Sequence, residues 1–242
     1  MMKENRILLV GGMGAGKTTL LDALLGRKFL SNECTSEITC VYNEDAYNEP
    51  PIIYNCNKYI GVKFCSNLSK KRLCFIDTPW GNEQDDIQIL EQIILTNNIT
   101  TILFVIRALH HIFEDYKTLA KVTEGTKSIF CLTRCDDFDP EEDDVISLID
   151  YLKKDIKSQL SEVGIDNSTI VTVSPLRALS IKRERGGDYS IRDYRIAKWQ
   201  DEEPLFHLDR YCDNAMEGNG YELLKHTGIL NLEALIYEDR KN

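Results

Sequence analysis

The stretch that decides the fold of this chain is Gly11-Gly12-Met13-Gly14-Ala15-Gly16-Lys17-Thr18. It fits the phosphate-binding loop pattern G-x-x-x-x-G-K-[S/T] at every fixed position. The apolar run 6–10 before it predicts a strand, and residues 19–25 after it predict a helix that Gly26 ends. Strand, glycine loop and helix are the context that the motif requires, because loop N–H groups and the helix N-terminus then face the same phosphate oxygens. The alternative is a glycine-rich turn with no ligand.

The loop residues have separate expected roles. Lys17 is expected to reach the β- and γ-phosphates, which also makes it a catalytic candidate, and the Thr18 hydroxyl is expected to bind Mg²⁺. Contacts to the nucleotide are expected from the whole run Gly12, Met13, Gly14, Ala15, Gly16, Lys17, Thr18 and Thr19.

Composition narrows the class of protein. The chain has 242 residues, of which 43% are hydrophobic, and a formal net charge of −10. This acidic balance argues against a protein whose main task is to bind nucleic acid, since phosphate neutralisation needs a basic face. The N-terminus carries no secretory signal, and the apolar run 102–106 is too short to span a bilayer. The eight cysteines include no C-x-x-C pair. We therefore expect a cytoplasmic protein without a zinc site.

Strand-like and helix-like segments alternate along the chain. This order predicts an α/β fold with a mostly parallel sheet and helices on both faces. Residues 59–65 and 72–76 are strand-like, and 66–71 between them predict a hairpin turn.

The C-terminal third departs from this alternation. Residues 177–220 are rich in charged and aromatic side chains and predict an insertion, and 228–239 predict a closing helix. We expect residues 1–242 to form a single domain. A basic cluster in the insertion could contact a membrane surface, although a solvated, salt-bridged segment is the plainer interpretation. Its members are Lys182, Arg183, Arg185, Arg192, Arg195 and Lys198.

A carboxylate follows the strand at 73–76. Asp77 is expected at the carboxyl end of that strand, where such a residue contacts the Mg²⁺ shell in phosphate-loop proteins. Trp80 stands where the D-x-x-G motif has glycine, and its backbone N–H is expected to meet the γ-phosphate. The alternative for Asp77 is a solvated residue at a strand end.

A second polar group follows the strand at 128–132. Thr133-Arg134-Cys135-Asp136 is similar to the [NT]-K-x-D guanine-recognition motif. Asp136 is expected to accept hydrogen bonds from guanine, Arg134 to stack on the base, and Thr133 to complete the motif. Ser174 and Pro175 follow the last strand, where a backbone N–H often reaches guanine. Since proline has no N–H, a neighbour must supply that donor.

The switch threonine and the residue that orients water are less clearly marked. Thr35 and Thr39 are both candidates for a hydroxyl that binds Mg²⁺ and an N–H that senses the γ-phosphate. Gln84 is the nearest glutamine to Asp77 that could orient the attacking water.

The order of these motifs resembles the translation-factor class of P-loop GTPases. Within it, the local sequence is similar to the IMAP (immune-associated nucleotide-binding) family and its relatives, the septins and the chloroplast import receptor GTPases. The supporting stretches are 26–29, 36–39, 77–79, 107–115 and 133–137. This resemblance implies a three-layer Ras-like P-loop GTPase fold, binding of GTP and GDP with Mg²⁺, and Thr39 as the switch threonine.

A second resemblance is to dynamin-like GTPase head domains. Residues 24–30, 174–179 and 228–235 are similar to this class, and the match at 24–30 favours Thr35 instead.

The sequence thus predicts slow GTP hydrolysis that serves as a conformational switch. Families of this type often complete the site through a partner, so we expect acceleration by a second copy across the nucleotide face. An effector protein is expected but not identified. Two alternatives stay open: a GTP-dependent assembly scaffold with little hydrolysis, and a P-loop ATPase or small-molecule kinase.

Overall fold

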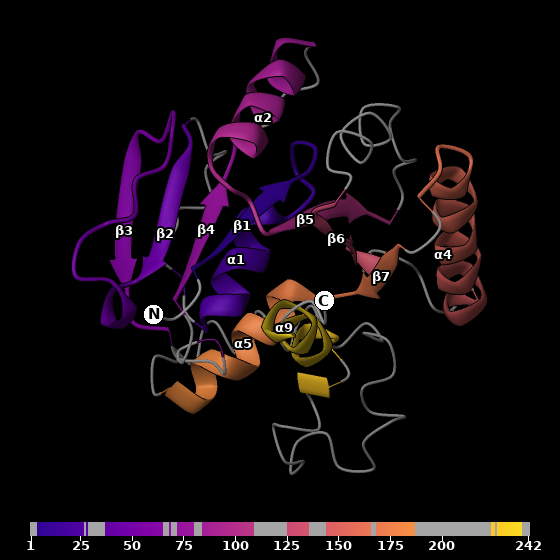
Figure 1. The fold of residues 1–242 in the computed structure, drawn as a ribbon. Coiled ribbons are helices and arrows are strands. Elements are labelled where there is room, and N and C mark those ends of the chain that lie inside the picture. Colours follow the sequence, from indigo (N-terminus) through magenta and orange to yellow (C-terminus); the bar gives the residue numbers. More distant parts are fainter. Residues whose placement is uncertain are drawn as a thin grey trace.

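The computed structural model is built around one seven-stranded sheet with helices on both faces. It describes residues 4–26, 28, 37–64, 68, 72–79, 84–108, 125–135, 144–165, 168–186, 224–225 and 227–238. The strand order is β3-β2-β4-β1-β5-β6-β7, and every neighbouring pair is parallel except β2 and β4. The expectation of a mostly parallel α/β sheet is confirmed (Figure 1).

The strands are short and mostly apolar. The central strands β1, β4, β5 and β6 are buried along most of their length, as expected where helices cover both faces of a sheet. Their bounds are Asn5–Val10 (β1), Thr39–Asn43 (β2), Lys58–Val62 (β3), Leu73–Asp77 (β4), Thr101–Arg107 (β5), Lys127–Thr133 (β6) and Thr169–Thr172 (β7).

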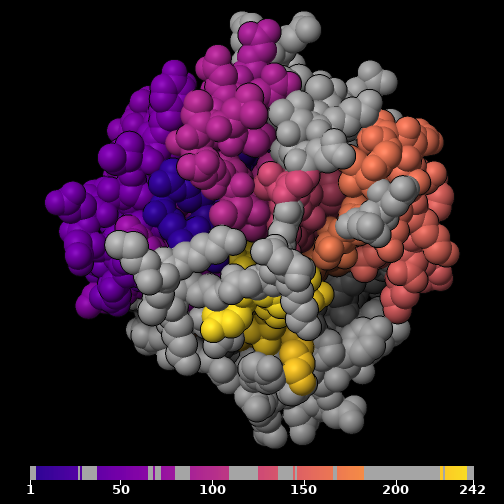
Figure 2. Space-filling model, in the orientation of Figure 1, coloured from indigo at the N-terminus to yellow at the C-terminus, as the bar shows by residue number. Residues whose placement is uncertain are grey.

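The helices form two layers. Helices α1, α5 and α9 cover one face of the sheet, and α2 and α4 cover the other (Figure 1). Their bounds are Lys17–Leu25 (α1), Gln84–Thr96 (α2), Val145–Ser161 (α4), Pro175–Gly186 (α5) and Ile229–Tyr237 (α9), with a short 3₁₀ helix at Glu44–Ala46. In the space-filling view, β2 and β3 lie at one edge of the molecule, and α4 lies at the opposite edge (Figure 2). No helix in the described part of the chain is long and apolar enough to cross a membrane.

The position of β1 fixes where a ligand can bind. β1 lies between β4 and β5, so the chain runs to one side of it and then to the other. In open parallel sheets, ligands bind outside the carboxyl ends of the strands at such a switch point. The glycine loop follows β1 directly and therefore lies there.

The predicted hairpin between residues 59–65 and 72–76 is wrong. β3 pairs with β2 in parallel, and β2 lies between β3 and β4. Strand-like composition does not specify a partner, and the exposed first residues of β3 suit an edge strand. Most of the predicted turn at 66–71 lies outside the described residues.

Two lysines hold α9 in place. Lys182 of α5 forms an ion pair with Glu233 of α9 and donates to the Ala23 carbonyl oxygen at 2.7 Å. At the other end of α9, Lys127 donates to the carbonyl oxygens of Leu235 and, at 3.1 Å, Glu238.

The structure corrects one member of the predicted basic cluster. The Lys182 side chain is only 11% exposed and joins α1, α5 and α9. Helix α5 thus takes up the start of the segment predicted as an insertion, and residues 187–223 lie outside the described residues.

We predict that Glu233→Ala lowers the free energy of unfolding by about 3–5 kcal/mol, because it leaves the Lys182 ammonium buried without its carboxylate. Urea denaturation measures this loss. The matched control is Asp45→Ala, which removes the exposed Asp45–Lys63 pair (3.7 Å) and should change stability by less than about 1 kcal/mol. Equal losses in the two variants would contradict the structural role of the buried pair.

Candidate functional site

The glycine loop is held in one backbone conformation. Gly16 has a φ of 92°, in the left-handed region, and begins α1 by accepting a hydrogen bond from the Leu20 N–H at 2.8 Å. A Cβ on Gly11 would lie 2.4 Å from the carbonyl oxygen of Val105, so the loop can pass β5 only with glycine there. The Ala15 N–H closes the turn on the Gly12 carbonyl oxygen at 3.1 Å. The loop therefore wraps the start of α1 as phosphate binding requires.

Lys17 is buried and lies along this loop. Its ammonium group donates to the carbonyl oxygen of Gly11 at 2.6 Å and contacts that of Gly12 at 3.4 Å. An ammonium group beside a helix N-terminus is a strong attractor for phosphate oxygens.

The first residues of α1 meet the end of β4. The Thr18 hydroxyl donates to Asp77 Oδ2 at 3.2 Å, and Asp77 is fully buried. Asp77 ends a parallel strand, while Thr39 begins the antiparallel strand β2 directly opposite it in register. Because opposite residues of an antiparallel pair share a face, the side chains of Thr39 and Asp77 project to the same side of the sheet. The Thr39 hydroxyl donates to the Glu37 carbonyl oxygen at 3.3 Å.

These residues fit a magnesium ion by their chemistry. Hydroxyl and carboxylate oxygens are the ligands that Mg²⁺ takes, usually few from the protein and the rest from water and phosphate. No group of three or more His, Cys, Asp or Glu in the described ranges could hold a metal. The candidate donors predicted from the sequence are one carboxylate and two hydroxyls, from Thr18, Thr39 and Asp77.

The start of the predicted base-recognition motif is joined to the glycine loop. The Thr133 hydroxyl contacts the carbonyl oxygen of Ala15 at 2.7 Å and that of Ile106 at 3.1 Å. β6 ends at Thr133, and Arg134 directly after it has a left-handed φ of 55°. The end of β6 and the phosphate-binding loop are thus fixed relative to each other.

The segment after β7 is held by the residues that directly precede α9. The Ser174 N–H donates to the Thr227 carbonyl oxygen at 2.9 Å, and Pro175 begins α5. A Cβ on Gly228 would lie 1.9 Å from the Thr172 carbonyl oxygen, and its φ is 74°. Only glycine fits this contact, which places α9 against the carboxyl end of β7.

The remaining predicted site residues are only partly described. Thr35, Trp80 and Asp136 lie outside the described residues. Gln84 is the first residue of α2, and its side chain is not described. Sequence reasoning missed Thr78, whose buried hydroxyl donates to the Leu9 carbonyl oxygen at 2.9 Å and holds the chain beyond Asp77 against β1. The sequence feature that could have identified Thr78 is its position directly after Asp77.

Comparisons with known proteins give matches by structure alone. No protein-family profile matches the sequence, and no curated protein is similar to it. One structural match is a chain from a bacterial dynamin pair, and its TM-score is 0.54. That pair is described as oligomerised and as a mechanism for the long-range sensing and tethering of membranes. The matching chain is 16% identical over 97% of this chain and 42% of its own length. A second chain from such a pair has a TM-score of 0.52 and is 17% identical, over 96% of this chain and 41% of its own length. A bacterial selenocysteine-specific elongation factor, EF-Sec, has a TM-score of 0.50. It is 19% identical over 86% of this chain and 30% of its own length.

These likenesses establish the fold. The chain has the α/β Ras-like fold of P-loop GTPases, and its structural neighbours include both classes that the sequence resembles, translation factors and dynamin-like proteins. The chain spans less than half the length of each of these neighbours. The narrower resemblance to the IMAP family stays a prediction.

Proposed function

We propose that this chain binds GTP and GDP with Mg²⁺ and hydrolyses GTP as a cytoplasmic conformational switch. The observation that carries the proposal is the convergence of Lys17, Thr18 and Asp77 at the carboxyl end of the central strands, with Thr18 and Asp77 3.2 Å apart. A glycine loop alone could be a structural turn. A buried ammonium group, a hydroxyl and a buried carboxylate beside it form the charge pattern that a magnesium–triphosphate complex needs.

The residues of this site have separate roles in binding. The backbone of residues 12–19 cradles the phosphates, and Lys17 exchanges its contact with the Gly11 carbonyl oxygen for phosphate oxygens. Thr18, Thr39 and Asp77 would hold Mg²⁺, which would neutralise charge on the phosphate oxygens. Gln84 is the candidate to orient water, and Trp80 to contact the γ-phosphate through its N–H.

The base preference rests on the sequence after β6. Asp136 is proposed to accept hydrogen bonds from guanine, with Arg134 stacked on the base and the Ser174–Pro175 segment near it. The contact of Thr133 with the glycine loop supports this proposal, because it fixes the first residue of the predicted motif relative to the phosphate-binding loop.

Guanine selectivity tests this assignment. In calorimetric titrations with Mg²⁺, a non-hydrolysable GTP analogue should bind about 100-fold or more tightly than the ATP analogue, since adenine leaves the Asp136 carboxylate unpaired. Asp136→Asn should move the preference to the xanthine nucleotide, whose base offers an acceptor to the new amide.

The matched control is Asp137→Asn, which removes the neighbouring carboxylate and should keep the preference for guanine. Equal or tighter ATP binding by the unmodified chain would support a P-loop ATPase or small-molecule kinase instead. A guanine preference that Asp136→Asn leaves intact would place base recognition elsewhere.

Magnesium dependence tests the phosphate end of the site. Thr18→Ala should abolish most of the gain in GTP-analogue affinity that Mg²⁺ gives over EDTA, a loss of about tenfold or more. Thr100→Ala is the control, because it removes a hydroxyl that donates to the Arg6 carbonyl oxygen (3.0 Å) at the other end of the sheet. If Thr18→Ala keeps the full magnesium gain, Thr18 is not a ligand.

We propose that hydrolysis is slow in the isolated protomer and is completed by a second copy across the nucleotide face. Turnover per protomer should then rise with protein concentration, from a dilute value on the order of 10⁻³ s⁻¹ or lower. Lys17→Ala gives the background rate. Turnover that is independent of concentration would exclude activation by a second copy. GTP-dependent assembly with no turnover above background would favour the scaffold, a function suggested by the structural neighbours described as an oligomerised dynamin pair.

A further inference from the structure

Three large apolar side chains are mostly exposed on two segments that are bonded to each other. Ile52 and Tyr54 belong to the loop between β2 and β3 and are 87% and 52% exposed, and Leu95 near the end of α2 is 73% exposed. We call Ile52, Tyr54 and Leu95 the apolar surface. Single exposed apolar residues are common on proteins, whereas several that are held together indicate an interaction site.

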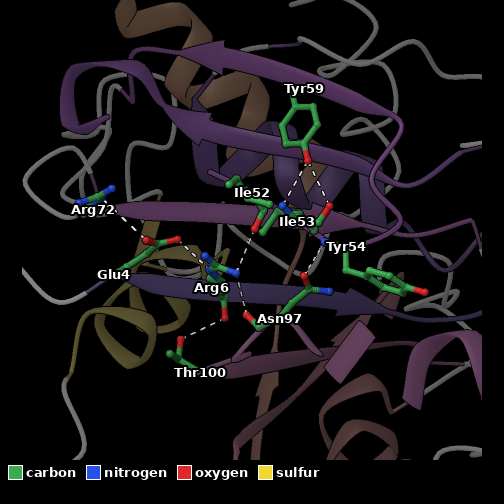
Figure 3. A network of polar contacts seen from close by, with 9 residues as sticks. All are labelled: Glu4, Arg6, Ile52, Ile53, Tyr54, Tyr59, Arg72, Asn97 and Thr100. Atoms are coloured by element: carbon green, nitrogen blue, oxygen red, sulfur yellow. Dashed lines mark hydrogen bonds and ion pairs between the residues drawn. The ribbon is translucent and has the colours of Figure 1, made fainter. Parts of the chain in front are cut away.

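Asn97, a buried residue directly after α2, joins the two segments. Its side-chain oxygen Oδ1 accepts a hydrogen bond from the Tyr54 N–H at 2.6 Å, and its carbonyl oxygen accepts one from Arg6 of β1 at 3.0 Å. The same Arg6 nitrogen donates to the Ile52 carbonyl oxygen at 3.2 Å (Figure 3). The backbone of Ile52 and Tyr54 is thus tied to the end of α2, which carries Leu95.

Further bonds hold the loop while the Tyr54 ring stays outside them. Arg6 is itself held by an ion pair with Glu4 at 2.8 Å. The Tyr59 hydroxyl contacts both backbone groups of Ile53, with its oxygen 3.2 Å from the N and 3.1 Å from the carbonyl oxygen. Figure 3 shows the Tyr54 ring pointing away from this network. Because the backbone is already fixed, a partner that binds here has little chain ordering to impose.

The outer face of α2 continues the apolar surface without charge. In residues 88–96, the exposed side chains are all uncharged, and they are Gln88, Ile89, Gln92, Leu95 and Thr96. The outward face of a helix ordinarily carries charged and polar residues, whereas the core of a protein interface is depleted of charge. This face of α2 therefore suits contact with another protein.

The charged side chains of the two segments are mainly acidic. Glu44, Asp45 and Glu49 are exposed, Glu91 of α2 is partly exposed, and Lys58 is the one basic residue between positions 44 and 58. A polypeptide with basic residues beside its apolar ones would complement these charges. A second copy of this chain, with its net charge of −10, or an anionic membrane would instead bring like charges together.

We propose that the apolar surface is a docking site for a partner protein that binds through apolar side chains flanked by Lys or Arg. The partner's apolar residues contact Ile52, Tyr54 and Leu95, and its basic residues face the acidic side chains before Ile52. The site is separate from the proposed nucleotide chemistry, and its test uses the chain without nucleotide.

Selection from a phage-displayed library of random 12-residue peptides on the folded, unmodified chain tests the proposal. The enriched peptides should carry a net positive charge and at least two large apolar residues. In fluorescence polarisation with the synthesised peptides, Ile52→Asp and Leu95→Asp should each weaken binding about tenfold or more. Each substitution also adds a negative charge, so a merely electrostatic attraction of a basic peptide would become tighter instead.

The matched control is Ile146→Asp, which adds the same charge at another exposed isoleucine, 58% exposed on α4, and should leave the affinity unchanged. Since all three side chains are mostly exposed, none of these variants should shift the midpoint of urea denaturation. A selection that enriches no peptide, or only acidic ones, would overturn the proposal. Peptides that bind Ile52→Asp and Leu95→Asp as tightly as the unmodified chain would overturn it too.

Two further measurements separate the other occupants of this surface. Sedimentation velocity without nucleotide should show no dimer that Ile52→Asp dissociates, and flotation with phosphatidylserine vesicles should show no binding that Ile52→Asp abolishes. A dimer of that kind would assign the surface to a second copy, and such vesicle binding would assign it to a membrane. Either result would refute docking of a basic partner protein.

Discussion

The hydrogen bond between Thr18 and Asp77 joins the two parts of the molecule on which the candidate site depends. Thr18 belongs to the first turn of α1, and Asp77 ends β4, the neighbour of β1. A fully buried carboxylate is costly unless hydrogen bonds or a cation compensate it. Its presence beside the glycine loop therefore indicates a place built for positive charge, which Lys17 and a bound metal ion would supply.

Contacts from neighbouring strands and helices hold this place in position. Thr133 connects the end of β6 to the carbonyl oxygen of Ala15, and Thr78 holds the chain after β4 on β1. The close contact of Gly228 with Thr172 and the buried pair of Lys182 and Glu233 fix α9 behind the loop. Sites that act on phosphates work mainly by positioning, so a preformed frame of this kind is what the proposed chemistry requires.

The sequence predicted the elements around the glycine loop because local signals agree there. Gly26 ends α1 with a left-handed φ of 80°, as the stop signal indicated, and Asp77 lies at the end of a buried strand. The parallel order of the sheet also followed from the alternation of strands and helices.

The features that could not be predicted from the sequence are contacts between residues far apart in the chain. The partner of β3 is β2 and not β4, because edge pairing leaves no mark in the composition of a short strand. Lys182 read as part of a basic surface, yet it is buried against Glu233, a residue 51 positions away.

A crystal structure with a non-hydrolysable GTP analogue and Mg²⁺ tests the central claim most directly. The account predicts that Lys17 leaves the Gly11 carbonyl oxygen for the β- and γ-phosphates. It also predicts that Mg²⁺ binds at Thr18 and Asp77 and that the base lies near the segment after Thr133. A nucleotide bound away from the glycine loop, or Lys17 still bonded to Gly11 with the nucleotide present, would contradict it.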